Sequence, residues 1–173
     1  MVHVSAGSRL RDIRTGKARS VHQDIIRNPA TPLPLDDELV NGAMFELIPN
    51  RPDTLGLIDG YPRLLRAVDG FVKAARRRNH RLIGCVSLEL SLGTSLRRIA
   101  GRGIREGEKL YDESLENYTR KRYQDHSDET MKAIKRISTV MPLVRLSAEG
   151  NSEEVWKRFS NAIGELVTAS GNK

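Results

Sequence analysis

Three short apolar runs alternate with segments whose apolar residues recur at helical spacing. The runs lie at residues 54–58, 82–90 and 143–147. The second run is mostly apolar, which is typical of a strand buried on both faces of a parallel sheet. Strands that alternate with helices favour parallel pairing through helical crossovers. The sequence therefore predicts an α/β fold, a parallel sheet with flanking helices. Without repeats or low-complexity tracts, it also predicts one domain over residues 1–173.

Helices are expected where apolar stripes, caps and stop signals agree. Asp36 is a good N-cap, and Pro49 stops the helix that follows it. Asn151 and Glu154 have the spacing of a capping box at the start of the last helix. The expected helices cover residues 9–15, 36–48, 64–78, 94–100, 115–137 and 151–166, and the buried face of the fifth is expected to include Leu115, Tyr118, Met131, Ile134 and Ile137. Prolines predict a loop over residues 27–35, and glycines predict a mobile loop after residue 100.

A motif with functional residues follows the first apolar run. Residues 57–63 read Leu-Ile-Asp-Gly-Tyr-Pro-Arg, so a buried strand would deliver Asp59 and Arg63 to the carboxyl edge of the sheet. Ligands bind at that edge in open α/β sheets. An acid for a metal ion and an arginine for a phosphate group suit nucleotide chemistry.

A phosphate-binding loop of the form GxxxxGK[ST] is absent from these 173 residues. Gly16-Lys17 comes nearest to that pattern. Ala18 follows, however, where a serine or threonine would hold magnesium, and Arg11 stands where the first glycine should be. The match therefore fails.

Several segments, in collinear order, resemble the adenylate kinases and their nucleoside monophosphate kinase relatives. Residues 59–63 are similar to the family's Asp-Gly-aromatic-Pro-Arg signature, and residues 4–11 are similar to its Ser-Thr-Gly-Asp-x-x-Arg segment. The other segments are residues 35–40 (Val-x-Asp-Glu-Leu-Val helix start), 98–102 (start of the lid), 116–122 (helix leaving the lid) and 151–155 (start of the final helix). The similarity covers about residues 2–166.

The resemblance implies a three-layer, P-loop-kinase-like architecture that lacks its first strand and phosphate loop. The acceptor-binding part would be about residues 5–50, and a short lid about residues 103–112. The missing strand would be the central one, and its loss would expose two neighbouring ladders. Two explanations stay open. The printed start is internal to a longer natural protein, or the chain is a degenerate relative.

The resemblance also assigns roles to individual residues. Arg11 and Arg63 fall on the positions that bind the acceptor monophosphate, and the alternative for both is surface arginines in helix-end salt bridges. Asp59 would hold a magnesium-bound water and not the metal directly, or else serve as a turn aspartate. The remaining candidates are Ser5 and Gly60 for the substrate, Arg102 and Arg122 over the donor and transferred phosphates, and Gly150 for ATP. Arg122 also fits a solvated charge in a basic run.

Departures from the family pattern leave the acceptor base open. Ala67 replaces the glutamine that reads the adenine edge, while Ala6 and Ser8 replace a threonine and an aspartate beside the acceptor nucleotide. Residues 111–114 lack the arginine of the lid exit, with Lys109 as a possible substitute. The short lid has no cysteine for a zinc site. Cys85 is expected to be a small buried hydrophobe, and the four histidines to be surface residues.

The first functional hypothesis is a cytoplasmic, monomeric nucleoside monophosphate kinase that transfers phosphate from ATP with magnesium. The second is a non-catalytic nucleotide-binding or regulatory module. The third, a basic nucleic-acid binder, draws on the net charge of +7, but aromatics make up only 5% and do not interleave with the arginine clusters. No apolar stretch approaches the roughly 20 residues of a membrane span, so no membrane partner is expected.

Overall fold

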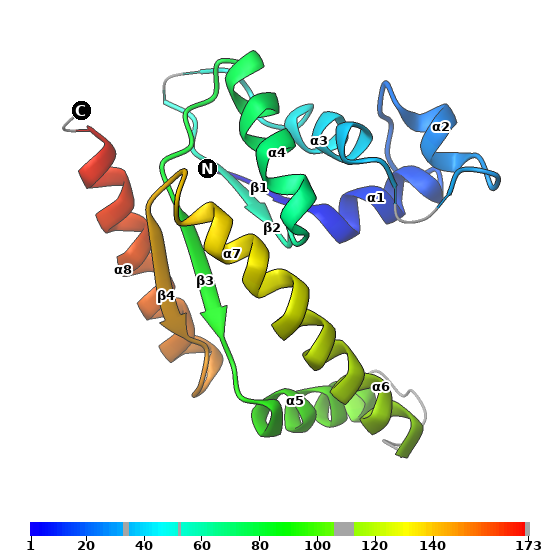
Figure 1. The fold of residues 1–173 in the computed structure, drawn as a ribbon, viewed down its shortest axis with the longest axis vertical. Coiled ribbons are helices and arrows are strands. Elements are labelled where there is room, and N and C mark those ends of the chain that lie inside the picture. Colours follow the sequence, from blue (N-terminus) through cyan, green and yellow to red (C-terminus); the bar gives the residue numbers. More distant parts are fainter. Residues whose placement is uncertain (33–34, 52, 106–112, 172–173) are drawn as a thin grey trace. The chain divides into compact units, whose positions relative to one another are not determined.

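The computed structural model describes residues 1–32, 35–51, 53–105 and 113–171 (Figure 1). The chain forms two compact units, Met1–Leu82 and Ile83–Lys173. Each unit pairs two short parallel strands and packs helices beside them, which confirms the predicted α/β class. Within the described ranges, no helix is long and apolar enough to cross a membrane.

The first unit places the ends of its two strands at one edge. Its elements are β1 (Val2–Ser5), α1 (Ala6–Arg14), α2 (Gln23–Arg27), α3 (Asp37–Phe45), β2 (Gly56–Asp59) and α4 (Leu65–Arg77). β1 and β2 are parallel, with Val2 opposite Gly56 and Ser5 opposite Asp59. The predicted cap of α3 is confirmed, since the Asp36 side chain accepts a hydrogen bond from the Glu38 N–H at 2.8 Å.

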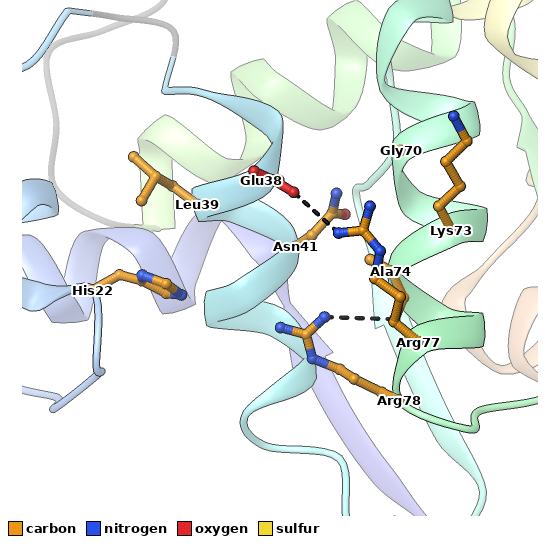
Figure 2. A pocket seen from close by; sticks show the side chains of 9 residues that line it. All are labelled: His22, Glu38, Leu39, Asn41, Gly70, Lys73, Ala74, Arg77 and Arg78. Carbon is orange, nitrogen blue, oxygen red and sulfur yellow. Dashed lines mark hydrogen bonds and ion pairs between the residues drawn. The ribbon is translucent and has the colours of Figure 1, made fainter.

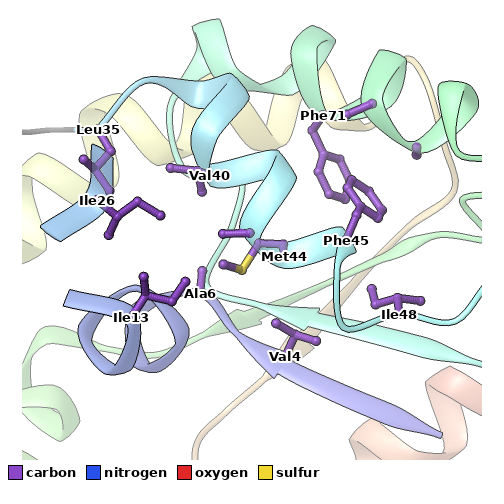
Figure 3. Packing of buried hydrophobic residues seen from close by; sticks show 13 residues of the cluster. Val4, Ala6, Ile13, Ile26, Leu35, Val40, Met44, Phe45, Ile48 and Phe71 are labelled. Atoms are coloured by element: carbon purple, nitrogen blue, oxygen red, sulfur yellow. The ribbon is translucent and has the colours of Figure 1, made fainter. Parts of the chain in front are cut away.

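The core of the first unit lies between β1, the short helices α1 and α2, and the pair α3 and α4 (Figure 3). Its members include Val4, Ala6, Ile13, Ile26, Leu35, Val40, Met44, Phe45, Ile48 and Phe71. The Phe45 and Phe71 rings stack with centroids 5.4 Å apart. Full burial of one such side chain stabilises a fold by about 1.5–3 kcal/mol. Gly56 lets Ile48 approach the strand, since a Cβ there would lie 2.8 Å from the Ile48 Cγ2.

The second unit has the same strand pairing with a different set of helices. Its elements are β3 (Cys85–Glu89), α5 (Leu92–Arg105), α6 (Glu113–Asp125), the π-helix η1 (His126–Thr130), α7 (Met131–Ile137), β4 (Leu143–Ser147) and α8 (Ser152–Gly171). β3 is parallel to β4, with Cys85 opposite Leu143 and Glu89 opposite Ser147. The capping box of α8 is confirmed by two 2.9 Å hydrogen bonds between Asn151 and Glu154.

The strands differ from the sequence prediction in number and pairing. β1 was not expected, although Val2 and Val4 alternate with polar His3 and Ser5 as in a half-buried strand. The described strands form two separate two-stranded sheets and not one continuous ladder. The predicted strand over residues 82–90 shortens to β3, because Leu82 packs against the core of the first unit.

Two helices also differ from the prediction. α5 continues through Gly101 and Gly103 to Arg105, beyond its expected end at residue 100. The long helix expected over residues 115–137 is interrupted by the π-helix η1. Ile134 and Ile137 are buried as predicted, whereas Tyr118 and Met131 are exposed. The Leu115 side chain lies outside the described residues.

Candidate functional site

The carboxyl ends of β1 and β2 bring two of the predicted site residues together. Ser5 ends β1 directly opposite Asp59 at the end of β2. Ser5 is the N-cap residue of α1, but its side chain makes no capping hydrogen bond. The Asp59 side chain is 63% exposed, and its Oδ2 lies 4.0 Å from His3 Nε2. A partly buried hydroxyl and an exposed carboxylate thus lie at the start of a helix. The proximity of His3 to Asp59 was not predicted from the sequence.

The turn after β2 directs the chain from this edge to α4. Gly60 has φ +75°, a left-handed conformation that favours glycine, and the Tyr61–Pro62 bond is cis. The Tyr61 ring packs edge-on against Phe71, with centroids 5.8 Å apart. Burial, helped by the nearby Asp37 carboxylate, raises the pKa of the Tyr61 phenol above its ordinary value. The buried ring therefore anchors the turn that ends at Arg63.

Arg11 and Arg63 present guanidinium groups that no acid neutralises within the described part of the chain. Both residues are exposed. Arg63 makes no hydrogen bond or ion pair to any described residue. Arg11, in the last turn of α1, donates only to Ser8 Oγ at 3.1 Å, and its Nη1 would lie 3.2 Å from a Cβ at Gly7. The helix-end salt bridges considered as the alternative for both arginines are absent from the described residues.

Arg9 differs from Arg11 in burial and in hydrogen-bond partners, a difference that the sequence analysis did not predict. It lies two residues before Arg11 on the same helix, yet only 9% of it is exposed. Its guanidinium donates to Ala43 O at 3.2 Å, to Arg19 O at 2.8 Å and to Glu46 Oε2 at 2.9 Å. Because these partners join α1 to α3 and to the loop after α1, Arg9 is a structural arginine.

The carboxyl edge of the second unit is closed by its own hydrogen bonds. The Glu149 carboxylate, just after β4, accepts from Thr94 Oγ1 at 2.6 Å and from the Ser91 N–H at 2.9 Å. The Thr94 hydroxyl, the Ser91 groups and the nearby Arg97 guanidinium lower the pKa of Glu149 to about 2. Arg97 Nη2 itself donates to Thr94 Oγ1 at 2.7 Å. Sequence analysis singled out neither Glu149 nor Thr94, which carry no motif.

Gly150 lies in the same edge with φ +96°. Its carbonyl oxygen accepts a 2.8 Å hydrogen bond from Arg98 Nη2, which also donates to Ala148 O at 2.8 Å. Arg158 donates to the Glu149 carbonyl. The predicted ATP position is therefore held in place by an arginine of α5 and an arginine of α8.

The other predicted residues are placed less completely. Arg102 lies in α5 and Arg122 in α6, and their side chains are outside the described residues. Of the expected lid, residues 106–112 are likewise outside them. Ala67 is 1% exposed, and its methyl side chain offers no hydrogen bond to a base. Cys85 is half-buried, and burial raises the pKa of its thiol.

Metal binding would depend on the exposed carboxylate of Asp59. No three His, Cys, Asp or Glu side chains among the described residues are grouped so as to hold a metal ion. Mg²⁺ commonly keeps several waters and binds through one or two carboxylates and the substrate phosphates. The single exposed carboxylate of Asp59 is compatible with that mode.

Comparison with known proteins gives relatives of one kind. No family model matches the chain. It is 31% identical over 108 residues to the adenylate kinase of Xanthomonas campestris pv. campestris (strain B100), which covers 62% of this chain and 56% of that enzyme. It is 32% identical over 111 residues to that of Xylella fastidiosa (strain M12), with 62% and 56% covered, and 25% identical over 122 residues to that of Helicobacter hepaticus (strain ATCC 51449 / 3B1), with 68% and 63% covered.

These similarities support a relationship between this chain and the adenylate kinases. The chain spans 56% of the length of the first two relatives. The relationship therefore covers part of the length of an adenylate kinase.

Proposed function

We propose that the first unit binds the phosphate of a nucleoside monophosphate at the carboxyl edge of β1 and β2. The observation that carries this proposal is the pair of exposed guanidinium groups, Arg11 and Arg63, which have no acid partner among the described residues. A guanidinium is permanently charged and can donate two parallel hydrogen bonds to one phosphate. The similarity to adenylate kinases supports a nucleotide as the carrier of that phosphate.

The residues of this edge would divide the work of binding. Arg63 receives the phosphate where the anchored turn leaves β2, and Arg11 adds a second cation from α1. The Ser5 hydroxyl and the Gly60 backbone border the same edge, and Asp59 orients a water bound to magnesium. Magnesium, when bound, would neutralise charge on the phosphates during transfer. Ala67 does not specify the base, because its methyl side chain is buried and has no hydrogen-bonding group.

By analogy with the adenylate kinases, we propose phosphate transfer from ATP to a nucleoside monophosphate as the activity of this protein. Arg102 and Arg122 would supply cations to the donor and transferred phosphates, and Gly150 would contact ATP. A non-catalytic nucleotide-binding module is the second candidate, and it is favoured by the absence of a GxxxxGK[ST] loop in the 173 residues. Both candidates require the same acceptor edge, so acceptor binding is the first property to test.

The test of acceptor binding is calorimetric titration of the chain with several nucleoside monophosphates. Arg63→Ala should weaken binding by about 1.5–3 kcal/mol, the usual range for a hydrogen bond to a charged group. Arg63→Lys should lose much of the same energy, because an ammonium keeps the charge but not the planar fork. The matched control is Arg51→Ala, which removes an exposed arginine from the loop before the opposite end of β2.

Three results would decide the matter. Equal weakening by Arg51→Ala and Arg63→Ala would show that only net charge attracts the nucleotide. Wild-type affinity in Arg63→Ala, or a large loss of thermal stability in its place, would make Arg63 a structural residue. A coupled kinase assay with ATP and magnesium separates the two candidates, since turnover above a purified blank ends the non-catalytic one.

A further inference from the structure

A polar cavity lies within the first unit, between α3 and α4 (Figure 2). We call it the α3–α4 pocket, and its volume is about 450 Å³. Sites for small molecules commonly measure about 300–1,000 Å³. The side chains that matter here come from three elements: His22 from the α1–α2 connection, Glu38 and Asn41 from α3, and Lys73, Arg77 and Arg78 from the α4 end. None of them is a residue of the β1–β2 edge.

The charge of this pocket is positive. Three cationic side chains, those of Lys73, Arg77 and Arg78, line it with one carboxylate, Glu38. Arg77 Nη1 donates to Glu38 Oε1 at 3.2 Å, and both side chains are largely exposed. Lys73 has no hydrogen bond or ion pair to any described residue. The three cations and the one carboxylate give the pocket lining a net charge of +2, which favours an anion.

One of these cations is held in place by the core. The Arg78 guanidinium carbon lies 5.6 Å from the centroid of the Phe45 ring, and Nη1 donates to Ala74 O at 3.5 Å. A cation over an aromatic face is attracted by the ring and loses mobility. Arg78 is thereby pre-positioned at the pocket, which lowers the entropic cost of binding a ligand there.

A buried amide without a partner supplies independent support for a ligand. Asn41 lines the pocket where α3 meets Gly70 of α4, and it is 2% exposed. Neither its Oδ1 nor its Nδ2 has a hydrogen-bond partner among the described residues. Buried polar groups are normally satisfied, by protein, by ordered water or by ligand. An amide left unsatisfied beside a cationic cavity is therefore placed to hydrogen-bond to a ligand or to a water that the ligand orders.

The wall formed by His22 depends on a glycine. The His22 ring packs where the Cβ of any larger residue at position 42 would be, so Gly42 allows the ring to lie against α3. Figure 2 shows His22 on the α3 side of the pocket and the cationic side chains on the α4 side. Polar groups thus reach the cavity from the α1–α2 connection, from α3 and from α4, whereas a flat basic surface would present cations from one element only.

We propose that the α3–α4 pocket binds a small molecule that carries two or more phosphate groups. Guanidinium groups favour phosphate because its oxygens accept parallel hydrogen bonds. The positive charge is spread over Lys73, Arg77 and Arg78, which suits a ligand with more than one anionic group. Asn41 and His22 would contact the uncharged part of the ligand or its terminal oxygens. The pocket is a second anion site, separate in its residues from the acceptor edge and independent of the proposed function.

Calorimetric titration with inorganic pyrophosphate tests the proposal. The parent protein carries Arg11→Ala and Arg63→Ala, which remove both arginines proposed to bind phosphate at the acceptor edge. In that background, Arg77→Gln should lower pyrophosphate affinity about tenfold, as expected for the loss of one charge-assisted hydrogen bond. The matched control, Arg76→Gln, removes the same charge from the neighbouring position of α4, which does not line the pocket, and should change affinity less than about twofold. Glu38→Gln should raise affinity severalfold, because it removes the carboxylate and frees Arg77.

Asn41→Leu gives a second readout that a merely basic surface would not show. Removing the unsatisfied amide should raise the melting temperature of the free protein and at the same time weaken pyrophosphate binding. No heat of binding at millimolar pyrophosphate would overturn the proposal. Equal losses in Arg76→Gln and Arg77→Gln would overturn it too, in favour of diffuse attraction. Tighter binding of a single-stranded oligonucleotide, equally sensitive to both changes, would identify a nucleic-acid surface and not a small-molecule site.

Discussion

The carboxyl edges of the two units both carry charged side chains, but the arginines of the first edge lack acid partners in the described part of the chain, whereas the charged side chains of the second are hydrogen-bonded within the unit. At the end of β1 and β2, Arg11 and Arg63 are exposed and have no acid partner among the described residues. At the end of β3 and β4, the carboxylate of Glu149 and the guanidinium of Arg98 are occupied by partners from the same unit. The first edge keeps its hydrogen-bonding capacity for a ligand, whereas the second uses it to hold its own loops.

The comparison separates binding arginines from structural ones by their partners and not by their sequence context. Arg9 and Arg11 make this point within one helix, since they stand two residues apart and differ in burial and in partners. Substitutions at paired groups should change stability, and those at unpaired groups should change binding.

The largest effect is expected at Arg9. Arg9→Ala removes three hydrogen bonds and leaves the Glu46 carboxylate, whose side chain is 22% exposed, without its cation. Unfolding free energy should fall by about 2–3 kcal/mol, because bonds to charged, partly buried groups are the strong ones. Denaturant unfolding measures the change. If Arg9→Ala unfolded like the wild type, pairing would not be what distinguishes the two arginines.

Arg11 should show the opposite behaviour. Arg11→Ala should weaken binding of a nucleoside monophosphate by about 1.5–2 kcal/mol and leave denaturant unfolding almost unchanged, since only the Ser8 hydroxyl loses a partner. Lys17→Ala, which removes an exposed cation just beyond α1, is the matched control and should retain affinity. A stability loss comparable to that of Arg9→Ala would remove the basis for the contrast.

A smaller effect is expected at Thr94, which is 8% exposed. Thr94→Val keeps the shape of the side chain but removes the hydroxyl that joins Glu149 to Arg97. The free energy of unfolding should fall by about 1 kcal/mol, the usual contribution of one such bond. Nucleotide affinity measured alongside should not change. Weakened monophosphate binding in Thr94→Val would mean that the second edge also serves the ligand.

The smallest effect concerns acid stability. The pKa of Glu149 is lowered from 4.5 to about 2 in the folded chain, so its ionised form is favoured by folding. Its contribution is fully present above pH 4.5 and should be lost as the pH falls from 4.5 towards 2. Glu149→Gln should flatten that part of the stability profile in denaturant titrations at stepwise pH. An identical profile in the variant would show that the edge does not depend on the charge.

The sequence predicted those parts of the fold that local rules determine. Asp36 caps α3, Asn151 and Glu154 form their box, and β2 and β4 lie close to the predicted positions. β1 was missed because only Val2 and Val4 of its four residues are apolar, whereas β2 overlaps a continuous apolar run. The π-helix η1 was missed because no proline or glycine marks residues 126–130.

The sequence predicted that Asp59 ends a strand, and Asp59 is the last residue of β2. Ser5 was named only through the family resemblance, because β1 itself was not predicted. Ser5 and Asp59 meet because parallel strands end at one edge. Sequence alone could not distinguish Arg9 from Arg11, because burial comes from contacts with Ala43 and Glu46, which are more than thirty positions away. The Glu149 cluster was missed for the same reason, since its partners on α5 are brought to it only by the fold.

The strand register described for β1 has a consequence for how this edge tolerates change. Side chains alternate along a strand, so a slip by one residue would turn Val4, now 2% exposed, out of the core and turn His3 and Ser5 into it. Strand register changes only in whole residues, so small changes in sequence cannot shift the geometry of this edge gradually. Substitutions at positions 3 and 5 can therefore explore new chemistry without moving the backbone. Burial of Val4 fixes the register of β1 and therefore the positions of residues 3 and 5 at the edge.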